Sequence, residues 1–299
     1  TLTINEDISV TELAPKIFST IRNRENITYN TIIESLSPEF NRDSVFKAGE
    51  GQGKSGSFFF FSHDKRFIIK TMNTEEYRAF TKMFRKYFKH ILKHKNSLIA
   101  QIFGIFTVHK EKIRPVHLIL MDNTLHLQGN NLKYIFDLKG SLVNRETKMK
   151  KDHKPSSTLK DINLLEIKKS HNILKFTQND KDKIMNMIQK DVPLLKSANI
   201  MDYSLLLAIE ENPDYRKHAK TLHKINKQSS SGSLSPPSYD KKSNENSRGA
   251  INESDFIELP SKKFENKRHM YLSANMQYIY HIAIIDYLQD YNYDKKLEN

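Results

Sequence analysis

Four glycines and a lysine near residue 50 form a pattern that suits phosphate binding. The run Gly49-Glu-Gly-Gln-Gly-Lys-Ser-Gly56 is flexible, and its backbone N–H groups can approach an anion closely because glycine has no Cβ atom. The run contains a GKS triplet, which also occurs in the nucleotide-binding loop GxxxxGK[ST]. That loop is excluded because Ala48 takes its first glycine position, and a strand-like aromatic run follows where the loop requires a helix.

Lys70 ends a strand-like run, FIIK, shortly after the glycine loop. A glycine loop between two strands, followed by a lysine at a strand end, is the arrangement in which kinases hold ATP: the loop covers the phosphates and the lysine reaches the α and β phosphates. A glycine-rich turn on its own is more often only a turn. The pattern therefore indicates a nucleotide site only together with other features.

Three aspartates next to apolar, strand-like runs could supply carboxylates to such a site. Asp137 begins DLKGS directly after YIF, Asp202 lies in IMDYSLL, and Asp286 ends IAIID. Carboxylate oxygens are the ligands that Mg²⁺ prefers, and a strand end fixes the direction of the side chain. Each aspartate alone is typical of a surface or capping position. Together with Lys70 they favour phosphate chemistry assisted by a divalent cation.

Hydrophobic periodicity predicts the elements that would position these residues. Residues 75–93 are typical of an amphipathic helix, with apolar and basic side chains on opposite stripes. A helical stretch is expected over residues 11–33, and another helix over 180–190 that stops short of Pro193. Strands are indicated over residues 57–71 (two runs around an SHDK turn), 101–109, 115–121, 134–138, 204–209 and 277–285. Clustered strands with one helix, followed by a more mixed half, predict an α+β protein of two lobes.

The composition indicates a folded protein that meets an anionic partner. The 299 residues carry a formal net charge of +13, and 37% are hydrophobic. This excludes collagen, a coiled coil and a fully disordered chain, whereas the charge favours nucleic acid, a membrane surface or a phosphorylated substrate. The absence of cysteine excludes disulfides, thiolate metal sites and cysteine nucleophiles. Residues 211–268 are expected to be a disordered polar insert, because Ser, Asn, Lys and Pro fill its centre.

The chain resembles the catalytic core of the phosphatidylinositol phosphate kinases through six strings in the same order and spacing: GKSGSFF, FIIKT, FDLKGS, TLKDIN, IMDYSLL and IIDYLQDYNYDKKLE. IMDYSLL and DLKGS are the most specific of these. The resemblance implies a bilobal lipid-kinase fold related to protein kinases over residues 45–299, with a helical region over 1–44 before it. The N-lobe, at about residues 45–121, would hold an antiparallel sheet plus a helix, and the mixed C-lobe would take about 122–299.

The resemblance also implies roles for individual residues. ATP would be held by the glycine loop, the strand lysine and the hinge, which correspond to Gly51, Gly53, Lys54, Ser55, Gly56, Lys70, Met121 and Asn123. Lys70, Asp202 and Asp286 would be catalytic: Asp202 would orient or deprotonate the inositol hydroxyl, and Asp286 would coordinate Mg²⁺. The lipid substrate would contact Lys139, Ser141, Lys295 and Lys296. Glu76 is expected either to pair with Lys70 or to be an ordinary first-turn helix residue.

The resemblance implies a cytoplasmic enzyme, peripheral at the cytosolic membrane face, that transfers the γ-phosphate of MgATP to a phosphoinositide. Phosphatidylinositol 4-phosphate is the expected substrate, because GKSGSFF and IMDYSLL look like the 4-phosphate 5-kinases. DLKGSLVNR and YDKKLE look closer to the 3-phosphate 5-kinases, which stay open as an alternative. A catalytically inactive, phosphoinositide-binding scaffold on the same fold also stays open. The chain is expected to be a fragment, since relatives continue beyond the position of Asn299.

Other readings of the sequence are disfavoured. An ordinary protein kinase would carry HRDxxxxN, DFG and APE motifs, which do not occur where such an enzyme needs them. A nucleic-acid partner is not expected, because no helix-turn-helix, zinc or RNP pattern is present. His90 and His94 have the i, i+4 spacing of zinc ligands but lack the glutamate of HExxH, so they are expected on a solvated helix face.

Overall fold

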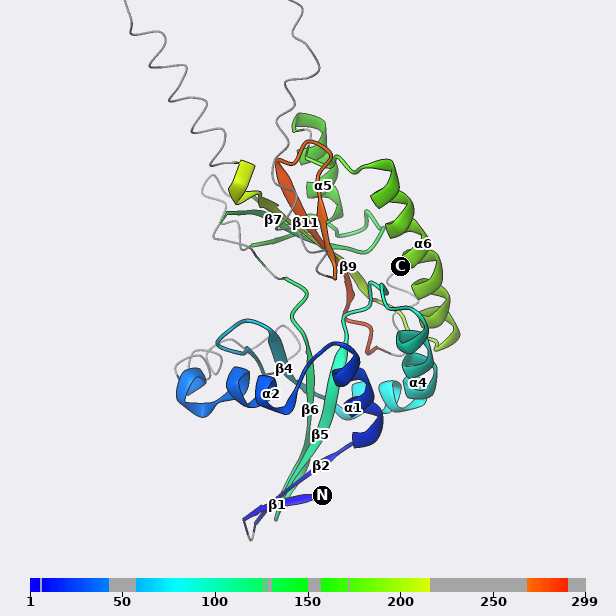
Figure 1. Ribbon diagram of the computed structural model, residues 1–299. Helices are drawn as coiled ribbons and strands as arrows, with labels where there is room; N and C mark the ends of the chain where they lie inside the picture. Colours follow the sequence, from blue (N-terminus) through cyan, green and yellow to red (C-terminus); the bar gives the residue numbers. More distant parts are fainter. Residues whose placement is uncertain are drawn as a thin grey trace, which may run out of the picture.

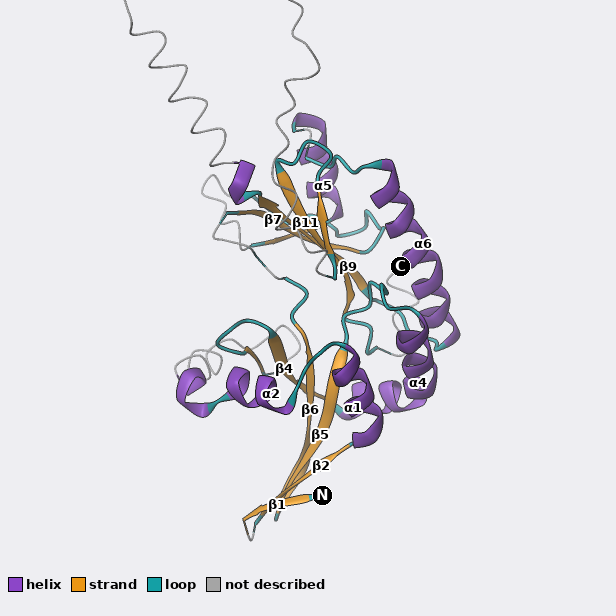
Figure 2. Ribbon diagram, viewed as in Figure 1, coloured by secondary structure: helices purple, strands orange, loops and turns teal. Residues whose placement is uncertain are grey.

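A computed structural model describes residues 1–5, 7–42, 58–125, 127, 131–149, 157–171, 173–215 and 268–289. Within these ranges the strands form two sheets, one in each lobe, with helices around them (Figure 1). Figure 2 shows the same division by secondary structure. The expected α+β fold of two lobes is confirmed. The glycine loop and nearly all of the expected polar insert lie outside the described residues.

The N-lobe is built on a six-stranded sheet in the order β1-β2-β5-β6-β4-β3. All its neighbouring strands run antiparallel. They are β1 (Leu2–Asn5), β2 (Ile8–Glu12), β3 (Phe59–Phe61), β4 (Phe67–Met72), β5 (Ile102–Lys110) and β6 (Ile113–Asp122). β3 and β4 are the two runs predicted around the SHDK turn. Lys70 on β4 pairs with Phe59 on one side and Ile119 on the other, so a strand fixes it at both edges.

The N-terminal residues correct one prediction. The helix expected over residues 11–33 is the end of β2 followed by two helices, α1 (Pro15–Arg24) and α2 (Tyr29–Leu36). Thr11 and Glu12 pair with β5, so their backbone groups are satisfied in the sheet. Pro15 begins α1, and Thr28 caps α2 by accepting a hydrogen bond from the Thr31 N–H. The expected helical region is therefore partly strand, and that strand extends the sheet that carries Lys70.

The helix expected over residues 75–93 is α4 (Thr74–Lys93). It begins with a capping box, in which Asn73 Oδ1 accepts from Glu76 N at 2.7 Å and Glu76 Oε2 accepts from Asn73 N at 2.9 Å. One face is buried in the core, as the apolar stripe predicted. Leu92, near the end of the helix, was also expected among its apolar, core-facing residues, but it is exposed.

The C-lobe sheet has five strands in the order β10-β11-β9-β7-β8. They are β7 (Leu132–Leu138), β8 (Thr158–Leu159), β9 (Ser204–Glu211), β10 (Met270–Leu272) and β11 (Tyr278–Ile285). The pair β7–β8 is parallel and the others are antiparallel, so the sheet is mixed. Two helices accompany it, α5 (Asp161–Ser170) and α6 (Gln178–Ser197). None of the described helices has the length and apolar character that a bilayer-spanning helix requires.

Helix α6 corrects a second prediction, because it passes through Pro193 and ends at Ser197. Proline lacks the N–H that would bond to the carbonyl of Gln189, but both residues are exposed, so water can satisfy that carbonyl. Beyond the proline, Leu194 and Leu195 are buried. The free energy gained by burying these two side chains stabilises the final turn and offsets the loss of the hydrogen bond.

The two lobes are joined through a strand-like contact and a buried carboxylate. Ala100 N donates to Ile284 O at 2.9 Å, and Ile284 N donates to Leu98 O at 2.7 Å. Asp191 on α6 is fully buried and accepts from Ser97 Oγ at 2.8 Å and from Leu98 N at 2.7 Å. Its Oδ1 also lies 2.6 Å from His90 Nε2 on α4. His90 is therefore not solvated as expected; its side chain is 10% exposed and ties α4 to α6.

Candidate active site

Two of the three aspartates singled out in the sequence lie with Lys139 at one end of the C-lobe sheet. Antiparallel pairing places Leu138, near the end of β7, opposite Leu205, near the start of β9. Ser204 in turn lies opposite Ile285, at the end of β11. The segments that follow β7, precede β9 and follow β11 are therefore neighbours. They carry Lys139, Asp202 and Asp286, although as many as 147 positions separate these in the chain (139 to 286).

Asp202 and Asp286 share an unusual backbone conformation. Their φ angles are +60° and +57°, in the left-handed region that non-glycine residues seldom adopt. Aspartate tolerates this region better than most residues because its short side chain can hydrogen-bond locally. Asp202 lies just before the start of β9, and Asp286 directly follows β11.

Lys139 and Asp202 form an ion pair at this end of the sheet. The Nζ of Lys139 contacts Asp202 Oδ1 and donates to the Asp202 carbonyl oxygen at 2.6 Å. Both side chains are partly buried, at 24% and 32% exposed. The pair links the DLKGS turn to the IMDYSLL segment.

Charged side chains of both lobes lie near enough to Asp286 to affect the pKa of its carboxyl. Its side chain is reachable by solvent, yet the surrounding protein removes part of its hydration, and this desolvation raises the pKa of the carboxyl above its usual value. The positive charge of Lys70 opposes the rise, the negative charge of Asp137 adds to it, and Lys139 opposes it again. Asp286 therefore lies close enough to β4 and β7 to sense both, and a cation beside it would be stabilising.

Lys70 and Glu76 form an ion pair in the N-lobe, with Nζ and Oε1 3.1 Å apart. The other carboxylate oxygen of Glu76, Oε2, completes the capping box of α4. The two expectations for Glu76 are therefore both met, since one oxygen serves each role. The lysine is held by the first turn of a helix whose far end reaches the lobe junction through His90.

Two of the expected ATP contacts lie at the hinge. Met121 is near the end of β6, and Asn123 directly follows that strand. The Asn123 side chain is 4% exposed, donating to Lys65 O at 2.7 Å and accepting from Leu125 N at 3.2 Å. It thus ties the β3–β4 turn to the hinge, and contact with adenine stays a prediction for both residues. The remaining expected site residues lie outside the described residues. They are the glycine-loop residues Gly51, Gly53, Lys54, Ser55 and Gly56, and the lysines Lys295 and Lys296.

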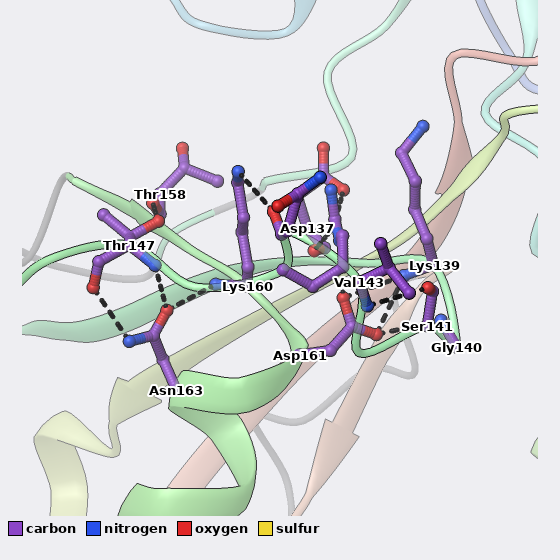
Figure 3. Close-up of polar contacts among 12 residues, drawn as sticks. Asp137, Lys139, Gly140, Ser141, Val143, Thr147, Thr158, Lys160, Asp161 and Asn163 are labelled. Carbon is purple, nitrogen blue, oxygen red and sulfur yellow. Dashed lines mark hydrogen bonds and ion pairs between the residues drawn. The ribbon is translucent and has the colours of Figure 1, made fainter. Parts of the chain in front are cut away.

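Two residues that sequence reasoning gave no role, Asp161 and Arg145, make the main polar contacts of the DLKGS turn; Figure 3 labels Asp161 beside the turn. Asp161 accepts from the backbone N–H groups of Lys139 and Gly140, and Arg145 Nε donates to Asp161 Oδ2 at 2.8 Å. Arg145 Nη2 also contacts Asp137, 2.8 Å from its Oδ1. A signal was present in the strings TLKDIN and DLKGSLVNR, but only the fold brings them together. Ser141 lies in the same turn, where its Oγ accepts from Val143 N at 3.2 Å.

Among the described residues, no cluster of three or more histidine or acidic side chains has the geometry of a metal site. Mg²⁺ seldom uses a full protein cage; it is commonly bound by one or two carboxylates together with substrate phosphates and water. The desolvated carboxylate of Asp286 is of the donor type that this ion prefers.

Comparison with known proteins gives a consistent result. A family model described as phosphatidylinositol-4-phosphate 5-kinase matches residues 40–299. A probable phosphatidylinositol phosphate kinase of Dictyostelium discoideum is 36% identical over 169 residues, which cover 56% of this chain and 23% of that protein. Phosphatidylinositol 4-phosphate 5-kinase its3 of Schizosaccharomyces pombe is 31% identical over 206 residues (69% and 27%). Phosphatidylinositol 5-phosphate 4-kinase type-2 gamma of Danio rerio is 32% identical over 205 residues (67% and 45%). The chain thus spans about a quarter of the length of the first two relatives.

Proposed function

Because the chain belongs to the phosphatidylinositol phosphate kinase family, we propose that it transfers the γ-phosphate of ATP to a ring hydroxyl of a membrane phosphoinositide. The observation that carries this proposal is the meeting of Lys139, Asp202 and Asp286 at one end of the C-lobe sheet, within electrostatic range of Lys70. Phosphoryl transfer requires positioning and charge stabilisation more than covalent chemistry from the protein. These side chains are of the types that such a reaction needs.

In the proposed reaction the inositol hydroxyl oxygen attacks the γ-phosphorus of ATP. The bond from that phosphorus to the β,γ-bridging oxygen breaks, ADP leaves, and the hydroxyl proton passes to the Asp202 carboxylate. Lys139 pairs with Asp202 and fixes the direction of its carboxylate, which suits a residue that must orient the hydroxyl. Lys70, held by Glu76, would contact the α and β phosphates.

We propose that Asp286 would hold a magnesium ion at this site. The fit rests on the carboxylate of Asp286, whose pKa is raised by desolvation and which a cation would therefore stabilise. When bound, the ion would neutralise negative charge on the transferring phosphate. The chain's own contribution is to hold this residue, in a left-handed backbone conformation, directly after β11.

We propose phosphatidylinositol 4-phosphate as the substrate and the 4,5-bisphosphate as the product. Several relatives bear the name phosphatidylinositol 4-phosphate 5-kinase, in yeast, plant and mouse, and one is named a phosphatidylinositol 5-phosphate 4-kinase. These names do not favour the 3-phosphate 5-kinase alternative. Lys139 and Ser141, on the turn beside Asp202, are proposed to contact the lipid headgroup. The net charge of +13 supports action at an anionic membrane face, since each basic residue near such a surface contributes about 1 kcal/mol.

The test is a radiolabelled-ATP assay on the protein expressed from its complete coding sequence. Liposomes would carry phosphatidylinositol 3-phosphate, 4-phosphate or 5-phosphate in turn, beside vesicles with none of them. We expect product from the 4-phosphate, and loss of product in Asp286→Asn and Asp202→Asn. Asp182→Asn, an exposed aspartate on α6, is the matched control and should keep full activity. No product from any lipid, with the protein folded and ATP bound, would refute the activity and leave a scaffold.

A further inference from the structure

The turn that follows β7 has an unusual support, because it is held more by polar contacts than by packing. A cavity of about 530 Å³ borders residues 138–142, lined also by apolar side chains of α5, α6 and β9. Leu142 and Val143, further along the turn, are 62% and 60% exposed. Gly140 has a φ of +70° and no neighbouring atom within reach of an added Cβ. Close packing therefore does not fix the course of this turn, and hydrogen bonds must do so.

Asp161 supplies those hydrogen bonds from the first residue of α5. Its Oδ1 accepts from Lys139 N at 3.0 Å and from Gly140 N at 2.8 Å, and its side chain is 10% exposed. Figure 3 shows the Asp161 side chain next to Lys139 and Gly140. Two successive N–H groups bound to one carboxylate fix the orientation of both peptide planes. The direction in which the Lys139 side chain leaves the backbone is thereby fixed as well.

Arg145 completes the support by joining Asp161 to the strand before the turn. Its guanidinium, with a side chain 13% exposed, bonds Asp161 through Nε and Asp137 through Nη2, each at 2.8 Å. Nη2 also contacts the Asp137 carbonyl oxygen. Only the planar fork of arginine can hold two carboxylates in this way, because a lysine ammonium is a single point of charge. The contacts between Arg145 and Asp137 thus join the two ends of the turn.

The same hydrogen bonds favour the ionised form of Asp161. Burial alone would raise the pKa of its carboxyl, but the hydrogen bonds from Arg145 and from the Gly140 and Lys139 amides outweigh burial and hold the pKa below the usual value. Asp161 is therefore ionised throughout the neutral range. A charged acceptor makes shorter and stronger hydrogen bonds than a neutral one.

We propose that Asp161 and Arg145 are positioning residues, which shape the DLKGS turn so that Lys139 reaches Asp202. This inference rests on the proposed function, because it assigns a purpose to the Lys139–Asp202 pair. Neither residue needs to touch substrate. Lys139 has a long and flexible side chain, and only a fixed backbone makes its contact with both Asp202 Oδ1 and Asp202 O persistent.

Asn163 offers a matched control in the same helix turn. It is 1% exposed, and its amide holds the neighbouring loop by accepting from Thr147 N at 2.8 Å and donating to Thr147 O at 2.9 Å. It also accepts from Lys160 N at 3.1 Å, and none of these contacts reaches Lys139 (Figure 3). A variant at Asn163 weakens a loop beside the turn without changing the turn itself. It separates positioning from a general loss of structure.

The experiment is a double-mutant cycle on the complete protein, with kcat and the KM for ATP measured for each folded variant. Asp161→Asn should lower kcat about 10- to 100-fold with little change in KM, since the transition-state arrangement is lost and ATP contacts are not. Lys139→Met should lower kcat at least as much. The double variant should be no slower than Lys139→Met, because Asp161 acts through Lys139. Asn163→Ala should keep kcat within about 2-fold.

Additive losses in the double variant would overturn the proposal, as would an equal loss of kcat in Asn163→Ala. A second readout, independent of activity, is hydrogen exchange of the Lys139 and Gly140 amides followed by NMR. Exchange at both should be faster in Asp161→Asn and in Arg145→Lys, and unchanged in Asn163→Ala. Unchanged exchange in Asp161→Asn would overturn the proposal. If the wild-type protein phosphorylates none of the lipids, the proposed function fails, and the exchange measurement alone decides whether Asp161 fixes the turn.

Discussion

Replacing Asp191 by alanine should strongly destabilise the protein, because this buried carboxylate joins the two lobes. The substitution leaves Ser97 Oγ, Leu98 N and His90 Nε2 without their shared acceptor, in a place where the Asp191 side chain is 0% exposed. A buried donor left without a partner costs about 1–3 kcal/mol, and three donors lose their acceptor here. Because such losses overlap, we expect a total of about 3–5 kcal/mol.

Urea unfolding followed by circular dichroism measures this free energy of unfolding. For a domain of this size each kcal/mol corresponds to a shift in Tm of about 2–4 °C, so a parallel thermal scan should show a fall of about 6–20 °C. The control is Asp182→Ala on the same helix, where the exposed carboxylate accepts a hydrogen bond from Gln178. It should cost less than about 0.5 kcal/mol. If Asp191→Ala lowered the free energy of unfolding by less than about 1 kcal/mol, the claim that Asp191 joins the two lobes would be refuted.

Three further predictions concern single residues. Glu76→Gln keeps an oxygen for the helix cap but removes the charge that holds Lys70, so kcat/KM for ATP should fall about 10- to 100-fold while Tm changes little; an unchanged kcat/KM would contradict the role of the pair. Burial raises the pKa of Tyr87 to about 12 from 10.0, so its contribution to stability is complete below pH 10 and is lost as pH rises through the folded-state value; stability against urea should fall more steeply there than in Tyr87→Phe. Because the pKa of Asp161 is held below 3.8, the difference in unfolding free energy between wild type and Asp161→Asn should be constant above about pH 5 and should shrink below 3.8, and a difference that already shrinks near neutral pH would show that Asp161 lacks these partners.

Local patterns in the sequence predicted most of the elements that carry the site. The period-3.6 stripe of α4 and the aromatic runs of β3 and β4 are properties of short segments, and the structure confirms both. The resemblance to a known family added the roles expected for Lys70, Asp202 and Asp286, which the fold brings to one region. Motif order was informative because the antiparallel pairing of β7, β9 and β11 aligns their neighbouring loops.

The failures came from interactions that no short segment contains. Thr11 and Glu12 looked helical until β5, about 95 residues later, supplied a pairing partner. Pro193 marked a helix end by local rules, but burial of Leu194 and Leu195 carried the helix past it. His90 seemed typical of a solvated face because Asp191, 101 positions away, could not be foreseen as its partner. The support of the DLKGS turn by Asp161 was missed for the same reason, since 21 positions separate that residue from Gly140.

The left-handed backbone at Asp202 and Asp286 restricts how these positions can change over evolution. With φ near +60°, glycine, asparagine and aspartate fit, whereas a β-branched or bulky residue would strain the turn. Glutamate would keep the negative charge and still fit the turn poorly. A lineage that abandons catalysis can therefore replace either aspartate most easily by asparagine or glycine and keep its fold. Sequences of relatives with those residues at these two positions would identify members that have become binding proteins while remaining stably folded.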